Sequence, residues 1–515
     1  MTDLITTDNL KWRIESGILY VEAAGEGDMK DYVRDNACFS PWYQDRHKIT
    51  EALISDGVTS IGAGAFYDCY KMERVTIPES VRSIGFQAFH NCENLKKLTM
   101  PSHLESVGDY AFTFCTSLKS ITFTSQTPPT IGRSLFETFQ GSKSMVTLYG
   151  DGIDSDLFGD ESIGNNGSIT FEIGGRRGNI TWSLVDGVLK LTIDRDENAE
   201  YEPFVKDNVC SAPWHKYRTG IHSATLSAGF LKINDGMFFD CTCLKKVEIP
   251  EVVSIGRQAF HNCRSLESLV LPASLKSIGD FAFTYCTSLE LVHLGTPWAP
   301  SLGYHMFDTV PDARVITLKG SGWNSAESLD ESNIGDNARV TFEANGSFDE
   351  IEWILRGGTL TIRPIIGSDG NMGEMVEDNV CSAPWHRYAL GIFEAVVEPG
   401  IRNLGAGAFY ECFNLREVDL PLSLESVGYQ AFHYCRSLRN VTFQMNVREI
   451  GDYAFTFCES LRSLYFLSLE SPDFGIGIFD GCPEDSEIRI HRLGWTPSNS
   501  NVKNYRMVRF VKIGD

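Results

Sequence analysis

The sequence predicts an α/β repeat solenoid, in which parallel β-strands stack coil upon coil, short helical or 3-10 turns join them, and strand-rich capping segments close the ends. Three observations predict this fold class: a long period, a short period nested within it, and the alternation of apolar residues inside the short period. The composition suits a packed core, because 42% of the 515 residues are hydrophobic and 22% are charged.

The long period is about 171 residues. Trp12, Trp182 and Trp353 lie 170 and 171 residues apart, and each begins the same pattern: WRIESGILYV, WSLVDGVLKL and WILRGGTLTI. A second landmark, which we name the PW element, follows each of them as DNACFSPWY, DNVCSAPWH and DNVCSAPWH. These landmarks predict three modules, residues 1–171, 172–342 and 343–515, with their repeats at about 57–150, 229–320 and 400–493.

The short period is 23 residues and reads L-x-x-I-G-x-x-A-F-x-x-C-x-x-L-x-x-L-x-L-P, as in VRSIGFQAFHNCENLKKLTMP from Val81. Nine clear copies occur, and each module adds a degraded fourth copy around Phe136, Phe307 or Phe479. A single coil of this size cannot bury its own apolar face, whereas stacked coils bury a continuous core.

The second half of the repeat has the strand signature of a leucine-rich repeat. Alternate residues of a strand face opposite sides, so we expect Leu98 and Met100 to point inward and Lys97 and Thr99 to point outward. An extra strand is expected before the first repeat of each module and a closing strand after the last. The expected extra strands are residues 49–54, 221–226 and 392–397.

The first half of the repeat is expected to be a turn with a short helical or 3-10 piece, in which Ala111 and Cys115 share a face. The glycine after Ile or Val, such as Gly85, suits a backbone turn that other residues resist. Nine of the 14 cysteines stand at the repeat position. We predict that they are buried free thiols stacked in a ladder, with few or no disulfides and no zinc, because metal binding needs clustered ligands.

The repeat, the tryptophan preamble and the PW element together resemble the BspA-like class of leucine-rich repeats, which are bacterial surface or secreted proteins. The resemblance covers essentially the whole chain. It implies a secreted or surface-attached binding protein, often linked to adhesion, and it carries no functional residues over. The first ten residues, MTDLITTDNL, do not read as a signal peptide. The resemblance predicts an extracellular or cell-surface location. The lack of a signal-peptide pattern in the first ten residues leaves the cytoplasm as the alternative.

Charge and missing motifs narrow the function further. The formal net charge of -23 is unfavourable for binding nucleic acid or anionic lipid, and no apolar run reaches the roughly 18 residues of a transmembrane segment. Phosphate-binding loops, H-E-x-x-H and G-x-S-x-G are absent from the sequence. We therefore expect no catalytic residues, no metal and no cofactor. A carbohydrate-active enzyme, which needs two carboxylates at a working distance, is the least favoured alternative.

Several weaker candidates have two interpretations each. The acidic stretch 151–161 is a loose calcium loop or, preferably, a solvated linker. Three histidines after the Ala-Phe pair would lie at the surface or cap a turn, unless they hold a metal. The PW tryptophans are plugs over the open first coil or sugar-binding platforms, and the Asp-Asn pairs are turn formers. The histidines are His90, His261 and His433, the tryptophans are Trp42, Trp214 and Trp385, and the Asp-Asn pairs are residues 35–36, 207–208 and 378–379.

A ligand is expected on the concave face that the outward side chains make. The predicted ligand-binding residues are Arg74, Lys97, Thr99, Lys246, Glu248, His293, Glu417, Asp419 and Tyr465. Outward residues differ between modules while inward residues recur, which suits both diversified binding surfaces and unconstrained solvent positions. The favoured function is a monomeric, non-catalytic binding protein for a protein or glycan ligand, with a role in adhesion and avidity from three modules. A structural or scaffolding protein of the cytoplasm or cell envelope is the alternative.

Overall fold

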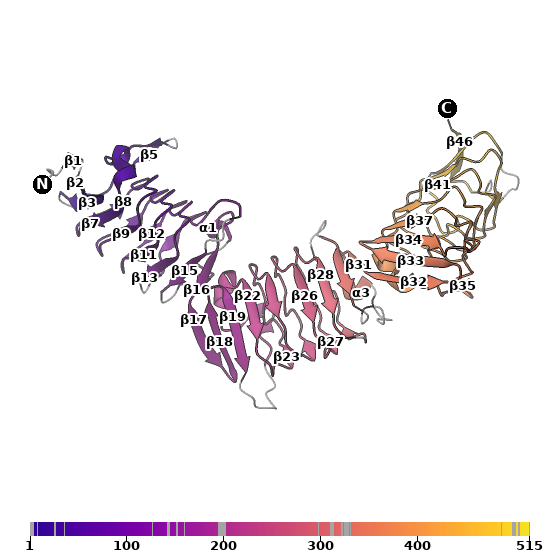
Figure 1. The fold of residues 1–515 in the computed structure, drawn as a ribbon, viewed down its shortest axis with the longest axis horizontal. Helices are drawn as coiled ribbons and strands as arrows, with labels where there is room; N and C mark the ends of the chain where they lie inside the picture. Colours follow the sequence, from indigo (N-terminus) through magenta and orange to yellow (C-terminus); the bar gives the residue numbers. More distant parts are fainter. Residues whose placement is uncertain are drawn as a thin grey trace. The chain divides into compact units, whose positions relative to one another are not determined.

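A computed structural model of the chain describes residues 5–7, 9–24, 27–34, 37–125, 127–141, 145–150, 153–158, 160–193, 202–296, 298–309, 314–320, 323, 329, 331–485, 487–496, 501–502 and 505–513. The chain divides into two compact units, residues 1–252 with 258–266, and residues 253–257 with 267–515. The division into three modules stays a prediction. Within each unit, strands stack in parallel layers, so the predicted solenoid is confirmed (Figure 1).

Three sheets open with the tryptophan preamble. The preamble forms an antiparallel hairpin, with Trp12 opposite Val21 in the first of them. Its last strand then pairs in parallel with the strand that follows the PW element, so the predicted extra strands are confirmed and the preamble extends the sheet. The strands are β1 (Ile5–Thr7), β2 (Leu10–Glu15), β3 (Ile18–Ala23), β7 (Glu51–Ile54) and β9 (Arg74–Thr76); β17 (Ile173–Arg177), β18 (Ile180–Val185), β19 (Val188–Ile193), β22 (Ser223–Leu226) and β24 (Lys246–Glu248); and β32 (Ala344–Phe348), β33 (Ile351–Arg356), β34 (Thr359–Pro364), β37 (Glu394–Val397) and β39 (Glu417–Asp419).

The later repeats supply all-parallel sheets. Each strand pairs with the strand one coil further along, for example Lys97 with Ser120. Leu98 and Met100 are buried and Lys97 and Thr99 are exposed, as the alternation predicts. The strands are β11 (Lys97–Met100), β13 (Ser120–Phe123), β15 (Val146–Tyr149) and β16 (Ile169–Phe171); β26 (Ser268–Leu271), β28 (Leu291–Leu294), β30 (Ile316–Lys319) and β31 (Val340–Phe342); and β41 (Asn440–Phe443), β43 (Ser463–Phe466), β45 (Ile488–Arg492) and β46 (Val508–Lys512).

Each coil also carries a second, shorter strand that the sequence did not predict. The residue pair before the glycine, such as Ser83–Ile84, aligns in parallel with its counterparts in neighbouring coils. These strands form a second set of parallel sheets. They are β4 (Gly27–Asp28), β8 (Val58–Ile61), β10 (Ser83–Ile84), β12 (Ser106–Val107) and β14 (Thr130–Ile131); β23 (Lys232–Ile233) in the first unit; β25 (Ser254–Ile255), β27 (Ser277–Ile278) and β29 (Ser301–Leu302); and β38 (Asn403–Leu404), β40 (Ser426–Val427), β42 (Glu449–Ile450) and β44 (Asp473–Phe474).

The expected helical piece of the repeat is replaced by a run of tight turns. Gln87 and Asn91 have φ values of 52° and 59°, and left-handed residues at this spacing interrupt a helix. The 3-10 helices lie instead in and after the PW elements, as η1 (Tyr43–Lys48), η2 (His215–Gly220) and η3 (His386–Gly391). Two four-residue α-helices, α1 (Asp160–Ile163) and α3 (Glu331–Ile334), precede closing strands.

The glycine of the repeat is needed because there is no room for a side chain at its position, and not because of its backbone conformation. Neither Gly85 nor Gly108 has a positive φ, which corrects the expected turn conformation. A Cβ on Gly85 would lie 2.6 Å from the backbone nitrogen of Ala63, and one on Gly108 would lie 2.7 Å from that of Phe86. The backbones of neighbouring coils thus approach too closely at this point for any side chain.

Two ladders of identical side chains fill the interior. Phe409, Phe432 and Phe455 stack with ring centroids 5.2 and 5.0 Å apart, and all three are fully buried. In later coils the cysteine donates its thiol proton to a phenylalanine carbonyl of the preceding coil, as Cys435 does to Phe409 at 3.1 Å. Burial holds the pKa of the Cys435 thiol well above its ordinary value, so the ladder position is chemically inert.

The PW tryptophans plug the first coils. Trp42, Trp214 and Trp385 are fully buried, and the indole of Trp385 donates a 2.7 Å hydrogen bond to the carbonyl of Ala408 in the first repeat. The ring of Trp353 packs edge-on at 6.0 Å. A buried ring presents no face to a sugar, so the plug interpretation is confirmed. Among the described residues, every helix is too short or too polar to cross a membrane.

Candidate ligand-binding surfaces

The side chains that point away from the interior on the main parallel strands form what we call the outward face. In the first unit it includes Arg74, Lys97 and Thr99, all exposed. Arg74 lies in register with Glu51 and pairs with its carboxylate at 3.1 Å, which raises the pKa of Arg74. Lys97 and Thr99 lie beside hydroxyl side chains of β13. The structure therefore brings two cations, Arg74 and Lys97, and several hydroxyl groups to this part of the outward face.

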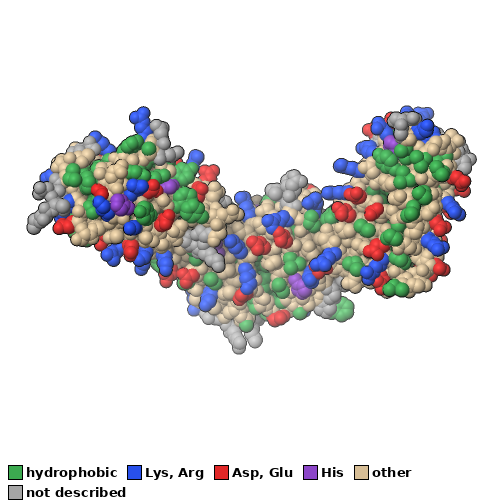
Figure 2. All heavy atoms as spheres, turned by 45° about the horizontal axis from the view of Figure 1, so that its top comes forward, with side chains coloured by type: hydrophobic (Ala, Val, Ile, Leu, Met, Phe, Trp, Pro, Cys, Tyr) green, Lys and Arg blue, Asp and Glu red, His purple; other side chains and the backbone are tan. Residues whose placement is uncertain are grey.

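Lys246 and Glu248 complete the predicted set in the first unit. They stand two residues apart on β24, and their charged groups form an ion pair of 3.0 Å with both side chains exposed. A pair this exposed contributes little to stability, which leaves both groups open to exchange partners with a ligand. Lys and Arg side chains are interspersed with Asp and Glu on the visible surface (Figure 2).

In the second unit the first of the predicted ligand-binding residues is His293 on β28. His293 is half-buried and lies in register between Val270, which is 65% exposed, and Lys319. Lys319 pairs with Glu343 at 2.7 Å and lowers the pKa of that carboxyl. An exposed aliphatic residue, an imidazole and an ammonium group thus follow one another across three coils.

The third predicted module contributes Glu417, Asp419 and Tyr465 to the outward face. Glu417 and Asp419 are exposed on β39, and Glu417 lies in register with Glu394. At the other end of this module, Arg489 and Arg509 lie in register on β45 and β46. The outward face therefore changes from acidic to basic along the module.

Tyr465 has an aromatic partner that sequence reasoning missed. Its ring stacks on the imidazole of His491, with centroids 4.2 Å apart and planes 11° from parallel. His491 belongs to the degraded fourth coil, where the repeat pattern is too weak to assign the register. The sequence offered one signal: a further strand of this module was expected about one repeat after the strand that carries Tyr465.

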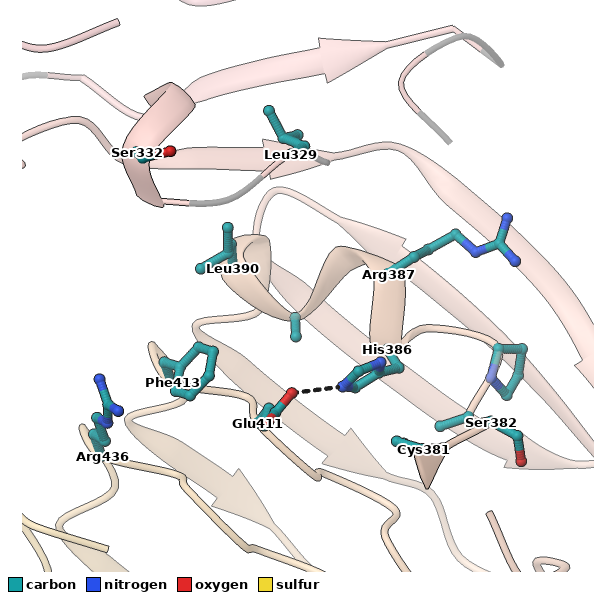
Figure 3. Close-up of a pocket in the computed structure, with 13 residues that line it drawn as sticks. Leu329, Ser332, Cys381, Ser382, His386, Arg387, Leu390, Glu411, Phe413 and Arg436 are labelled. Carbon is teal, nitrogen blue, oxygen red and sulfur yellow. Dashed lines mark hydrogen bonds and ion pairs between the residues drawn. The ribbon is translucent and has the colours of Figure 1, made fainter. Parts of the chain in front are cut away.

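A pocket opens beside the third PW element (Figure 3). It has a volume of about 730 Å³, within the range of small-molecule sites. Its lining residues are Leu329, Ser332, Cys381, Ser382, Ala383, Pro384, His386, Arg387, Ala389, Leu390, Glu411, Phe413 and Arg436. Figure 3 shows Arg387 and Arg436 on opposite sides, with Leu390, Phe413 and the hydrogen-bonded pair of His386 and Glu411, 3.2 Å apart, between them.

A pocket of about 620 Å³ lies beside the second PW element, against the β17–β18 hairpin. Cys210, Ser211, Ala212, Pro213, His215 and Lys216 line it, at the same sequence positions as six of the residues above. His215 stands where His386 stands, but its Nε2 is buried without a hydrogen-bond partner, since Asp240 is one methylene shorter than Glu411. Burial lowers the pKa of His215.

The PW elements begin with short hairpins, β5 (Val33–Arg34) with β6 (Ala37–Cys38), β20 (Val205–Lys206) with β21 (Val209–Cys210), and β35 (Val376–Glu377) with β36 (Val380–Cys381). Residues 207–208 and 378–379 both take φ values between 50° and 62°, so these two turn formers are confirmed. Residues 35–36 lie outside the described residues. Asn379 also accepts a 3.1 Å hydrogen bond from Gln430, which fixes the hairpin to the second repeat.

The three repeat histidines were expected at the surface or capping a turn, but His433 is buried and His90 and His261 are half-buried. The ring of His433 is 7% exposed and stacks on Tyr410 at 4.8 Å, and His90 stacks on Tyr67 at 4.6 Å. His261 stacks on an aromatic ring in the same way. The position after the Ala-Phe pair repeats in every coil, so its side chains stack along the solenoid. Burial lowers the pKa of all three imidazoles.

His433 is expected to make stability depend on pH. Its pKa is lowered, chiefly by burial and against the opposing charge of Glu411, so the neutral ring stabilises the fold. This contribution is complete above the unfolded pKa of about 6.5 and is lost as pH falls below it. The substitution His433→Phe keeps an aromatic ring in the stack and should flatten the decline of the melting temperature between pH 7 and pH 5. The exposed His103→Gln variant should decline as the parent protein does.

The acidic stretch gives no cation site among the residues described. Asp156 pairs with Arg218 at 2.9 Å, and Asp154 accepts a hydrogen bond from the backbone of Asp156. Residues 151–152 and 159 lie outside the described residues. Over the described part of the chain, no group of three or more His, Cys, Asp or Glu side chains is arranged to hold a metal ion.

Comparison with known proteins gives one family and several solved structures. The family model described as "BspA type Leucine rich repeat region" matches residues 39–162, 215–321 and 392–500 in six copies. A leucine-rich repeat protein from Eubacterium ventriosum is 19% identical, with 92% of this chain and 93% of that one covered and a TM-score of 0.27. A leucine rich cell surface protein from Faecalibacterium prausnitzii is 16% identical, with 98% of each chain covered and a TM-score of 0.21. Curated protein sequences give no match.

Proposed function

Because the chain belongs to the family of BspA-type leucine-rich repeat proteins, we propose that it is a non-catalytic binding protein of the cell surface or the extracellular space. The outward face of its parallel strands binds a protein or glycan ligand and serves adhesion. Tandem modules that meet a repeated ligand gain avidity, because the second contact forms at a high effective concentration.

One observation carries this proposal: the exposed side chains of the outward face differ between coils, while the buried side chains of the same strands recur. Lys97 and Thr99 flank the buried Leu98, whereas Val270 and Ser268 flank Leu269 at the corresponding place. Stacked rings such as Tyr465 on His491 are half-buried, so part of their surface remains open to a ligand. Aromatic residues in a polar surrounding are typical of binding hot spots.

The experiment is a screen of immobilised glycans and matrix proteins with the full chain, followed by substitution of the outward face. A variant that combines Lys97→Ala, His293→Ala and Tyr465→Ala is expected to bind the ligand found in the screen about fivefold or more weakly. Its melting temperature should stay within about 2 °C of the parent protein, because these side chains are exposed or half-buried.

The matched control combines Lys71→Ala and Tyr429→Ala, two side chains on the turn side of the coils. Equal binding by the parent protein and the triple variant would exclude these strands as the ligand surface. Loss of binding by the control alone would move the site to the turn side.

A further inference from the structure

We infer that the pockets beside the second and third PW elements are binding sites for an acidic peptide segment with apolar residues between its carboxylates. The residues of both sites come mainly from the PW element and its 3-10 helix, together with the turn side of the first coils at the third PW element and the β17–β18 hairpin at the second. The chemistry of the lining determines this ligand class.

The third PW element offers cations at both sides of an apolar floor. Arg387 extends from η3 on one side, and Arg436 lies on the other (Figure 3). Leu390 and Phe413 lie between them. The guanidinium of Arg436 stands 4.9 Å over the Phe413 ring and 3.6 Å from Glu459, and its side chain is 45% exposed. A ligand carboxylate can therefore reach Arg436 without entering the core.

The pocket beside the second PW element also has two cations, although its remaining lining comes mainly from the β17–β18 hairpin and not from the first coils. Lys216 stands at the sequence position of Arg387, and Arg176 provides a second cation in the lining. Tyr217 and Ile173 supply apolar surface, and the ammonium of Lys216 lies 5.1 Å from the ring of Tyr217. Each pocket is lined by two cations and one carboxylate, Glu411 in one and Asp156 in the other, so each lining carries an excess of positive charge in a chain whose net charge is -23.

The size and the lining favour a peptide over a sugar. A volume of about 730 Å³ accommodates two or three side chains. Ala383, Pro384 and Leu390 give the lining an apolar part, which can bury apolar side chains of a peptide between the two cations. Two separated cations match two carboxylates along an extended segment.

The test uses the full chain and a blocked tetrapeptide, Glu-Leu-Phe-Glu, acetylated and amidated at its ends. Titration calorimetry should find two sites per chain. Combining Arg387→Gln with Arg436→Gln should remove one site or weaken it about tenfold, and Lys216→Gln should weaken the other. Arg439→Gln, a neighbouring exposed arginine outside the pocket, and Tyr465→Ala on the outward face should leave both sites unchanged.

The matched ligand control replaces both glutamates of the peptide by glutamine and should abolish binding. A peptide that binds equally well after both pocket arginines are replaced would overturn the inference. Binding of tetragalacturonate without binding of the peptide would also overturn it, in favour of an acidic glycan. Because Tyr465→Ala reports on the outward face separately, failure here is distinguishable from failure of the proposed function.

Discussion

Replacing Phe432 by alanine is expected to lower the free energy of unfolding of its part of the stack by about 3–5 kcal/mol. Phe432 is fully buried between Phe409 and Phe455, with ring centroids 5.2 and 5.0 Å away. Removing the ring leaves a cavity whose walls are held by the hydrogen-bonded strands above and below, so the coils cannot close over it. Each coil also depends on its neighbours for burial, so the loss spreads to adjacent repeats.

Hydrogen exchange followed by mass spectrometry measures this effect coil by coil. Backbone amides of residues 400–466 should exchange faster in Phe432→Ala, with a gradient away from the substituted coil. The control is Tyr429→Ala, which removes a 40% exposed ring from the same coil and should change exchange little. Equal protection in Phe432→Ala and the parent protein would mean that the phenylalanine ladder does not hold the coils together.

The main strands and the inward ladders could be predicted because the same pattern recurs nine times. An alternation such as that around Leu98 is weak in one strand, but its recurrence fixes the register. The second set of parallel strands escaped prediction, since two residues such as Ser83 and Ile84 are too few to show a period. The helical expectation was wrong because the left-handed conformations of Gln87 and Asn91 cannot be read from their side chains.

The candidate sites were less accessible to sequence reasoning than the fold. The nine predicted residues lie on the outward strands, yet what binds there stays a prediction. The partner of Tyr465 was missed because His491 lies in a degraded coil. The pocket beside the third PW element combines Leu329 and Arg436, which stand 107 residues apart in the sequence and come together only through stacking. No local pattern marks such a pocket, whereas the histidine stacks could have been found from the recurrence of their position in each coil.

Replacing Trp385 should have a comparably large effect, and two substitutions divide it into its physical parts. Trp385→Phe keeps most of the apolar contact but leaves the buried carbonyl of Ala408 without its 2.7 Å donor, at a cost of about 1–3 kcal/mol. Trp385→Ala also removes the contact with Trp353 and opens the end of the first coil, at a cost of about 3–5 kcal/mol. Trp298, which is 75% exposed in the same unit, serves as the control, and Trp298→Ala should be neutral.

Thermal unfolding and hydrogen exchange should therefore rank the variants Trp298→Ala, Trp385→Phe and Trp385→Ala in order of increasing damage, with the loss of protection starting at residues 394–412. This order follows from the plug: the preamble strands continue the sheet beside the first coil, and the indole covers the interior of that coil, which no preceding repeat covers. If Trp385→Phe were as harmful as Trp385→Ala, the hydrogen bond to Ala408 would account for the whole effect. If both substitutions were neutral, the first coil would be held by its strands alone. The constant spacing between the PW tryptophan and the first repeat in the three copies would then need another explanation.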